Sequence, residues 1–143
     1  MNLKNIFNII SYFQYPLAIL AIYFTILEDF NSFLIFMGLA ISFSTLQDTN
    51  KIQNKFDKVI LENPKKGKIF FVFVTVLAFF LIFLGICGYL ITENEKAHEL
   101  SIGTLVLGIG FISMLKTGLE MFEIHRKDKN TTANKVYKSL GNK

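Results

Sequence analysis

The stretch IFFVFVTVLAFFLIFLGICGYLI, residues 69–91, decides the fold of this chain. It contains no Asp, Glu, Lys or Arg, and it follows directly on Lys65, Lys66 and Lys68. About 20 apolar residues in a helix that rises 1.5 Å per residue cross the roughly 30 Å hydrocarbon core of a bilayer. A surface helix of a soluble domain would show a polar face, and this stretch shows none. We therefore predict a transmembrane helix over residues 69–91.

Three further segments are predicted to cross the membrane. The first covers about residues 6–27 and contains Pro16, which is expected to kink the helix. The second, over residues 31–47, is the weakest, because its apolar part is short and is diluted by Ser and Thr. The last covers about residues 100–122. The predicted fold is all-α, a polytopic membrane protein whose four transmembrane helices form two hairpins in one four-helix bundle, and residues 1–143 make a single domain.

The basic residues predict the orientation of these spans. The chain has 15 Lys plus Arg, and most of them flank the spans on one side. These residues are Lys4, Lys51, Lys55, Lys58, Lys65, Lys66, Lys68, Arg126, Lys127, Lys129, Lys135, Lys138 and Lys143. Lys96 alone lies in a loop on the other side, where the loops are acidic. Because basic loops stay in the cytoplasm, we predict cytoplasmic N- and C-termini in the plasma membrane, the inner membrane of a bacterial cell.

Other features of the sequence argue against several classes of function. The single cysteine, Cys87, rules out an internal disulfide, and the sequence shows no GxxxxGK[ST], HExxH, GxSxG or CxxC motif. The centres of the four spans hold no ionisable residue, whereas a proton-coupled transporter keeps an acid there. The basic residues that give the net charge of +4 flank apolar segments. This placement favours anionic lipid headgroups over nucleic acid as their partner. We expect no catalytic site, no metal and no cofactor.

A stripe of small residues runs along the last span. Gly103, Gly110 and Thr117 recur every seven residues, and Ser113 lies on the same stripe. Gly38 and Ser42 form a similar pair on the second span. Small residues let a neighbouring helix approach closely, and Ser or Thr can form a hydrogen bond across the contact. The stripe predicts either packing within one bundle or a contact with another subunit.

A cluster of charges lies near the cytoplasmic end of the last span. Lys116, Glu120 and Glu123 are spaced by four and three, so they share one helix face. Lys116 lies about one turn inside the membrane boundary, from which its side chain can reach the headgroups. The pattern predicts an interfacial ion pair between Lys116 and Glu120, or a polar lining at the cytoplasmic mouth of a pore that Asp48 would join.

Two cytoplasmic segments complete the chain. Residues 48–62 carry an amphipathic stripe of Ile52, Phe56 and Ile60, and Asn63–Pro64 ends it. With Lys65, Lys66 and Lys68, this segment is a candidate contact for lipid or a partner, either on the membrane surface or as an extension of the second span. Residues 127–143 form a basic tail.

These features lead to three hypotheses about function. The first is a homo-oligomer that forms or gates a pore, or acts as a membrane-perturbing effector, because four helices rarely enclose a pathway alone. The second is a non-catalytic anchor or subunit that binds a cytoplasmic or membrane partner through its basic face. A small-solute transporter is a weaker third, because the centres of the spans are apolar.

Overall fold

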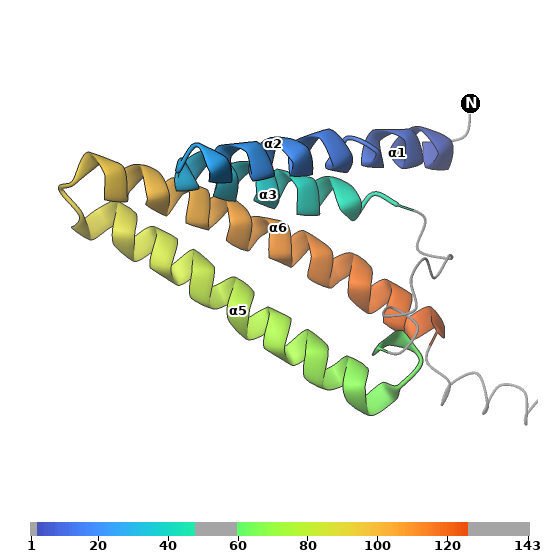
Figure 1. Cartoon of the computed structure of the whole chain (residues 1–143). Coiled ribbons are helices and arrows are strands. Elements are labelled where there is room, and N and C mark those ends of the chain that lie inside the picture. The colour runs from blue at the N-terminus through green and yellow to red at the C-terminus, as the bar shows by residue number, and fades with distance from the viewer. Residues whose placement is uncertain (1–2, 48–59, 126–143) are drawn as a thin grey trace, which may run out of the picture.

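The computed structural model describes residues 3–47 and 60–125, and every regular element in these two ranges is an α-helix. Figure 1 shows their arrangement. The helices are α1 (Leu3–Ser11), α2 (Gln14–Ile26), α3 (Phe30–Ser44), α5 (Pro64–Ile91) and α6 (Glu95–His125). The all-helical fold predicted from the sequence is therefore confirmed. The predicted segment 48–62, apart from its last three residues, and the tail 127–143 lie outside the described residues.

Three of the helical segments are long and apolar enough to cross a membrane. They are Asn5–Ile26 with 22 residues, α5 with 28 residues and α6 with 31 residues. They correspond to the spans predicted at residues 6–27, 69–91 and 100–122. The fourth predicted span is the shorter helix α3, whose 15 residues rise about 22 Å at 1.5 Å per residue. It is shorter than the predicted range of 31–47.

The first long segment is interrupted between α1 and α2, and Pro16 explains the break. Proline has no N–H, and its ring clashes with the carbonyl four residues earlier, here that of Tyr12. The Tyr12 carbonyl instead accepts a hydrogen bond from the Tyr15 N–H at 3.2 Å, a tighter i to i+3 turn. α2 then continues to Ile26. The kink predicted at Pro16 is present, one turn before the proline itself.

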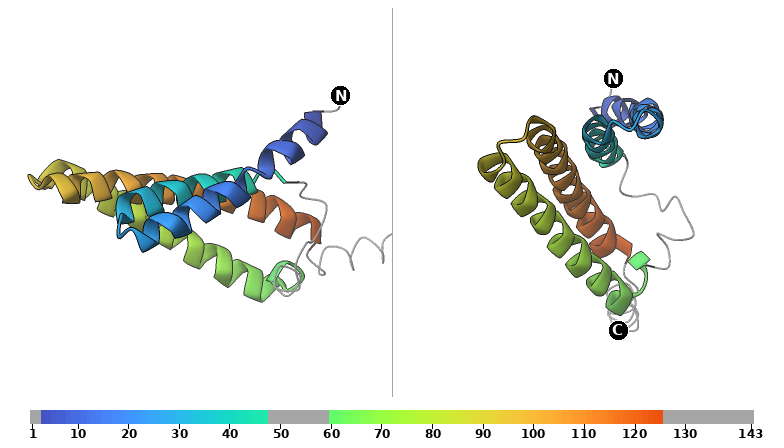
Figure 2. Two further views of the ribbon diagram at one scale, coloured as in Figure 1. Left: turned by 45° about the horizontal axis from the view of Figure 1, so that its top comes forward. Right: turned by 60° about the vertical axis from the view of Figure 1, so that its left-hand side comes forward.

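The long helices lie in an open row. α2 packs on α3, α3 packs on α6, and α6 packs on α5, whereas α2 and α5 at the two ends make no comparable contact. Figure 1 shows α6 between α3 and α5, and Figure 2 shows α2 with α3 as one pair and α5 with α6 as the other. The helices pair as α2 with α3 and α5 with α6, and they lie in an open row where the sequence predicts one four-helix bundle. The buried core lies mainly between α5 and α6, where Phe71, Val74, Ala78, Leu115 and Phe122 meet.

Large apolar side chains cover the outside of this row. Ile26 and Leu90 leave 75% of their surface exposed, and Phe73 and Phe83 leave 64% exposed. In water such a surface would be costly, at about 25 cal/mol per Å² of apolar area. In the hydrocarbon core of a bilayer it carries no such penalty. The exposed faces of α2 and α5 are therefore compatible with a chain embedded in a membrane.

The turn between α2 and α3 is closed by Asp29. Its Oδ1 accepts a hydrogen bond from the Ser32 N–H at 3.1 Å and caps the first turn of α3. The hydrogen bonds to Ser32 lower the pKa of this carboxyl below its ordinary value of 3.8. A carboxyl whose pKa is lower in the folded state stabilises that state above its unfolded pKa. The stabilisation is lost as the pH falls through the lowered folded pKa.

We expect the start of α3 to loosen when the pH is lowered from 7 through the folded pKa of Asp29, which lies below the ordinary value of 3.8. Protonation of Asp29 removes the charged acceptor, so the hydrogen-exchange protection factor of the Ser32 amide should fall several-fold. Asp29→Ala should give the low protection at both pH values. Asn63 caps α5 through hydrogen bonds from the Lys65 and Lys66 N–H groups but does not titrate, so the Lys66 amide is the control. A Ser32 amide that keeps its protection at low pH would contradict the assignment.

Candidate functional site

The small-residue stripe of the last span lies against α3 of the same chain. Gly110 faces Gly38 so closely that a Cβ added to Gly110 would lie 2.5 Å from the Gly38 carbonyl oxygen. The Gly103 N–H donates to Asn31 Oδ1 at 3.1 Å, and Thr117 Oγ1 donates to the Thr45 carbonyl at 3.2 Å. Each of these three pairs is separated by 72 residues, so α3 and α6 run parallel and in register.

The other two hydroxyls of the predicted stripe stay within their own helices. Ser113 Oγ donates to the Ile109 carbonyl at 3.4 Å, and Ser42 Oγ donates to the Gly38 carbonyl at 2.9 Å. The α3–α6 contact therefore occupies Gly38, Gly103, Gly110 and Thr117 within one chain. This arrangement corresponds to the packing alternative for the stripe. Asn31, which supplies a hydrogen bond between the helices, was not among the residues selected from the sequence.

The predicted charged cluster lies on a different face of α6. Lys116, Glu120 and Glu123 are exposed. By helical periodicity these three charged residues share their face with four exposed apolar side chains, and we call this set the outer face of α6. Its members are Ile102, Ile109, Ile112, Lys116, Leu119, Glu120 and Glu123. Asp48, the fourth predicted member of the cluster, lies outside the described residues.

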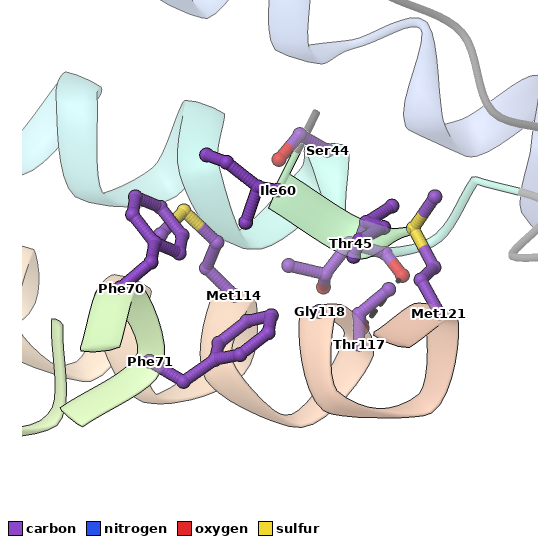
Figure 3. A pocket seen from close by; sticks show the side chains of 10 residues that line it. Ser44, Thr45, Ile60, Phe70, Phe71, Met114, Thr117, Gly118 and Met121 are labelled. Carbon is purple, nitrogen blue, oxygen red and sulfur yellow. Dashed lines mark hydrogen bonds between the residues drawn. The ribbon is translucent and has the colours of Figure 1, made fainter. Parts of the chain in front are cut away.

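A cavity of about 310 Å³ lies on the opposite side of α6, between the ends of α3, α5 and α6. Figure 3 shows that residues from all three helices, and from the turn before α5, point into it. It is lined by Ser44, Thr45, Ile60, Leu61, Phe70, Phe71, Met114, Thr117, Gly118 and Met121. Neither Lys116 nor Glu120 lines it, so the charged cluster and the cavity are separate features of the chain.

The residues predicted to contact lipid or a partner divide into three groups. Ile60 turns inward and lines the cavity, next to the buried Leu61. Lys65, Lys66 and Lys68 are exposed at the start of α5. Ile52 and Phe56 lie outside the described residues. The basic end of α5 therefore adjoins the cavity, because Lys66 lies one helical turn before Phe70.

The cavity was not predicted from the sequence. Its walls come from three segments that are far apart along the chain, and an antiparallel α5–α6 contact brings Phe71 next to Phe122 at a ring-centroid distance of 5.5 Å. The one local signal is the spacing of Met114 and Met121, which lie seven residues apart and hence on one helix face.

The described residues also include side chains of the types that bind metal ions. Within residues 3–47 and 60–125, no group of three His, Cys, Asp or Glu side chains lies close enough to hold a metal ion. His98 stacks near Tyr89 with ring centroids 4.1 Å apart, and Cys87 is a free, half-buried thiol. The candidate sites are therefore the outer face of α6 and the cavity.

No protein-family model, no curated protein and no solved structure matches this chain. The function of the chain is therefore inferred from the physical chemistry of these two sites.

Proposed function

We propose that this chain is a non-enzymatic protein of the plasma membrane that self-associates, and that the assembly forms or gates a pore. One observation carries the proposal: Lys116 and Glu120 are exposed on the outer face of α6, among apolar side chains. A single chain would leave both charges toward lipid near the cytoplasmic boundary, where a charge costs less than at the bilayer centre (about 2.5–3.5 kcal/mol) but still more than in a pair. In the proposed assembly, the Glu120 of a second copy pairs with each Lys116, and the contact shields both charges from lipid.

The proposed assembly needs four membrane crossings. α3 lies parallel to α6 from Asn31 beside Gly103 to Thr45 beside Thr117. Helices that run side by side in one direction cross the same layer, which supports α3 as the fourth span although it is short. A span shorter than the hydrocarbon core is accommodated by local thinning of the bilayer. With four spans, the basic residues place both termini in the cytoplasm.

The shape of the single chain supports a pore formed between chains. An open row of helices encloses no pathway of its own, because its two end helices make no contact comparable to those between neighbours. A pathway across the membrane would therefore have to form between chains. In a ring of copies whose α6 outer faces surround the pathway, the charged residues lie at the cytoplasmic end and the apolar residues above them. That arrangement suits a gate, because a hydrophobic constriction opens and closes by wetting.

Two measurements on the purified full-length chain test this proposal. Light scattering in mild detergent should give a protein mass that is a multiple of 16.4 kDa. Reconstituted liposomes should leak small ions at a rate that rises linearly with ion concentration. A strictly monomeric chain would refute the assembly, and saturable uptake of a solute would indicate a carrier instead of a pore.

A further inference from the structure

The lining of the cavity is mostly apolar. Six of its ten lining residues are large and apolar, namely Ile60, Leu61, Phe70, Phe71, Met114 and Met121. Its volume of about 310 Å³ is at the lower end of the range for ligand pockets, about 300–1,000 Å³, and about twice that of a cavity that binds benzene. Methionine side chains adapt to flexible apolar ligands. These properties suit a flexible chain of methylene groups.

The hydroxyl groups in the cavity have no free proton to offer a ligand. Ser44 Oγ donates to the Ile41 carbonyl at 2.6 Å, and Thr45 Oγ1 donates to the Ser42 carbonyl at 2.7 Å. Thr117 Oγ1 is used in its hydrogen bond to α3. A polar ligand buried here would leave its acceptors without partners, which is unfavourable. The hydrogen bonding therefore favours an apolar occupant.

The lysines at the start of α5 favour an occupant that carries a negative charge. Lys66 lies four residues before Phe70, so it shares the cavity-facing side of α5 and lies nearer the membrane surface. A Lys near a membrane surface attracts anionic lipid. Ile69, by contrast, is 72% exposed on another side of α5, one helical turn after Lys65.

From these observations we infer that the cavity binds one acyl chain of an anionic phospholipid, whose phosphate is held at Lys66. The inference rests on the membrane placement within the proposed function but not on self-association. The lipid would fill the groove between α3 and α5 along α6. It would thereby hold together the cytoplasmic ends of the two hairpins.

Tryptophan fluorescence gives a direct test, because the chain contains no Trp. Phe70→Trp places a single reporter in the cavity wall, and Ile69→Trp places a matched reporter at the same depth on the exposed side. Each full-length variant is reconstituted once with brominated phosphatidylglycerol and once with brominated phosphatidylcholine. The bromine atoms on the acyl chains quench Trp on contact. We expect phosphatidylglycerol to quench Trp at position 70 several-fold more than phosphatidylcholine does, with a smaller difference at position 69. Ile60→Trp, on the opposite wall, repeats the test if the first variant does not fold.

Two lysine variants separate a specific site from general attraction of anionic lipid. Lys66→Gln should abolish the preference for phosphatidylglycerol at position 70 and leave position 69 unchanged. Lys65→Gln should have the smaller effect at position 70. Equal preference at the two reporters, or equal effects of the two lysines, would overturn the inference. Failure here in a chain that still self-associates would leave the proposed function standing, and a monomeric chain with selective quenching would refute only the assembly.

Discussion

Gly110→Leu and Gly38→Leu are expected to separate α3 from α6 and to unfold the chain in mild detergent. A Cβ at Gly38 would lie 2.7 Å from the Val106 carbonyl oxygen and 2.9 Å from the Leu107 Cα. These are backbone atoms, which cannot rotate away, so the helices must move apart. Overpacking costs about 1–3 kcal/mol even where side chains can adjust. Against a total stability of about 5–15 kcal/mol, the leucine variants should lose most of their stability and the alanine variants about 3 kcal/mol.

Unfolding by increasing mole fraction of sodium dodecyl sulfate, followed by circular dichroism, measures this effect. Gly88→Ala is the comparison, because its added Cβ would meet a side-chain atom, Ser101 Oγ, which can move by rotation at the cost of its hydrogen bond to the Ala97 carbonyl. Its midpoint should fall less than that of Gly110→Ala, whose Cβ meets backbone that cannot rotate. Gly110→Ala with an unchanged midpoint would show that α3 and α6 do not pack as closely as described.

The α3–α6 contact also shows how far the sequence alone could lead. A heptad spacing identifies Gly103, Gly110 and Thr117 as one helix face. It does not identify the helix that covers this face, because any close neighbour needs the same small residues. The register became visible only in three dimensions, where these three residues each meet a residue 72 positions earlier.

The helices themselves were predicted more completely than their arrangement. Hydrophobicity is a property of each local segment, so residues 69–91 could be recognised as a span without knowledge of any neighbour. The open row could not be recognised, because closure of a bundle depends on whether α2 and α5 meet. The cavity was missed for the same reason: Ile60 and Met114 belong to segments whose proximity no local pattern encodes. The break near Pro16, by contrast, follows from one residue.

Charge reversal on the outer face of α6 is expected to dissolve the proposed assembly. Lys116→Glu would place a second negative charge one helical turn from Glu120 and opposite the Glu120 of the neighbouring copy. Like charges brought together at an interface cost several kcal/mol, and each 1.4 kcal/mol changes the association constant tenfold. We therefore expect association to weaken on the order of 100-fold or more, with a shift to monomer in light scattering and a loss of ion leak from liposomes.

The double variant Lys116→Glu with Glu120→Lys separates pairing from simple loss of a lysine. It exchanges the two charges on the same face, so in a symmetric assembly every Lys again meets a Glu. Association and ion leak should both return toward those of the parent chain. Lys96→Glu is the control, because Lys96 is exposed at the opposite end of α6 and should leave association unchanged. A double variant as monomeric as Lys116→Glu would show that these residues do not pair between copies, and the interface would then have to lie on another face of the row.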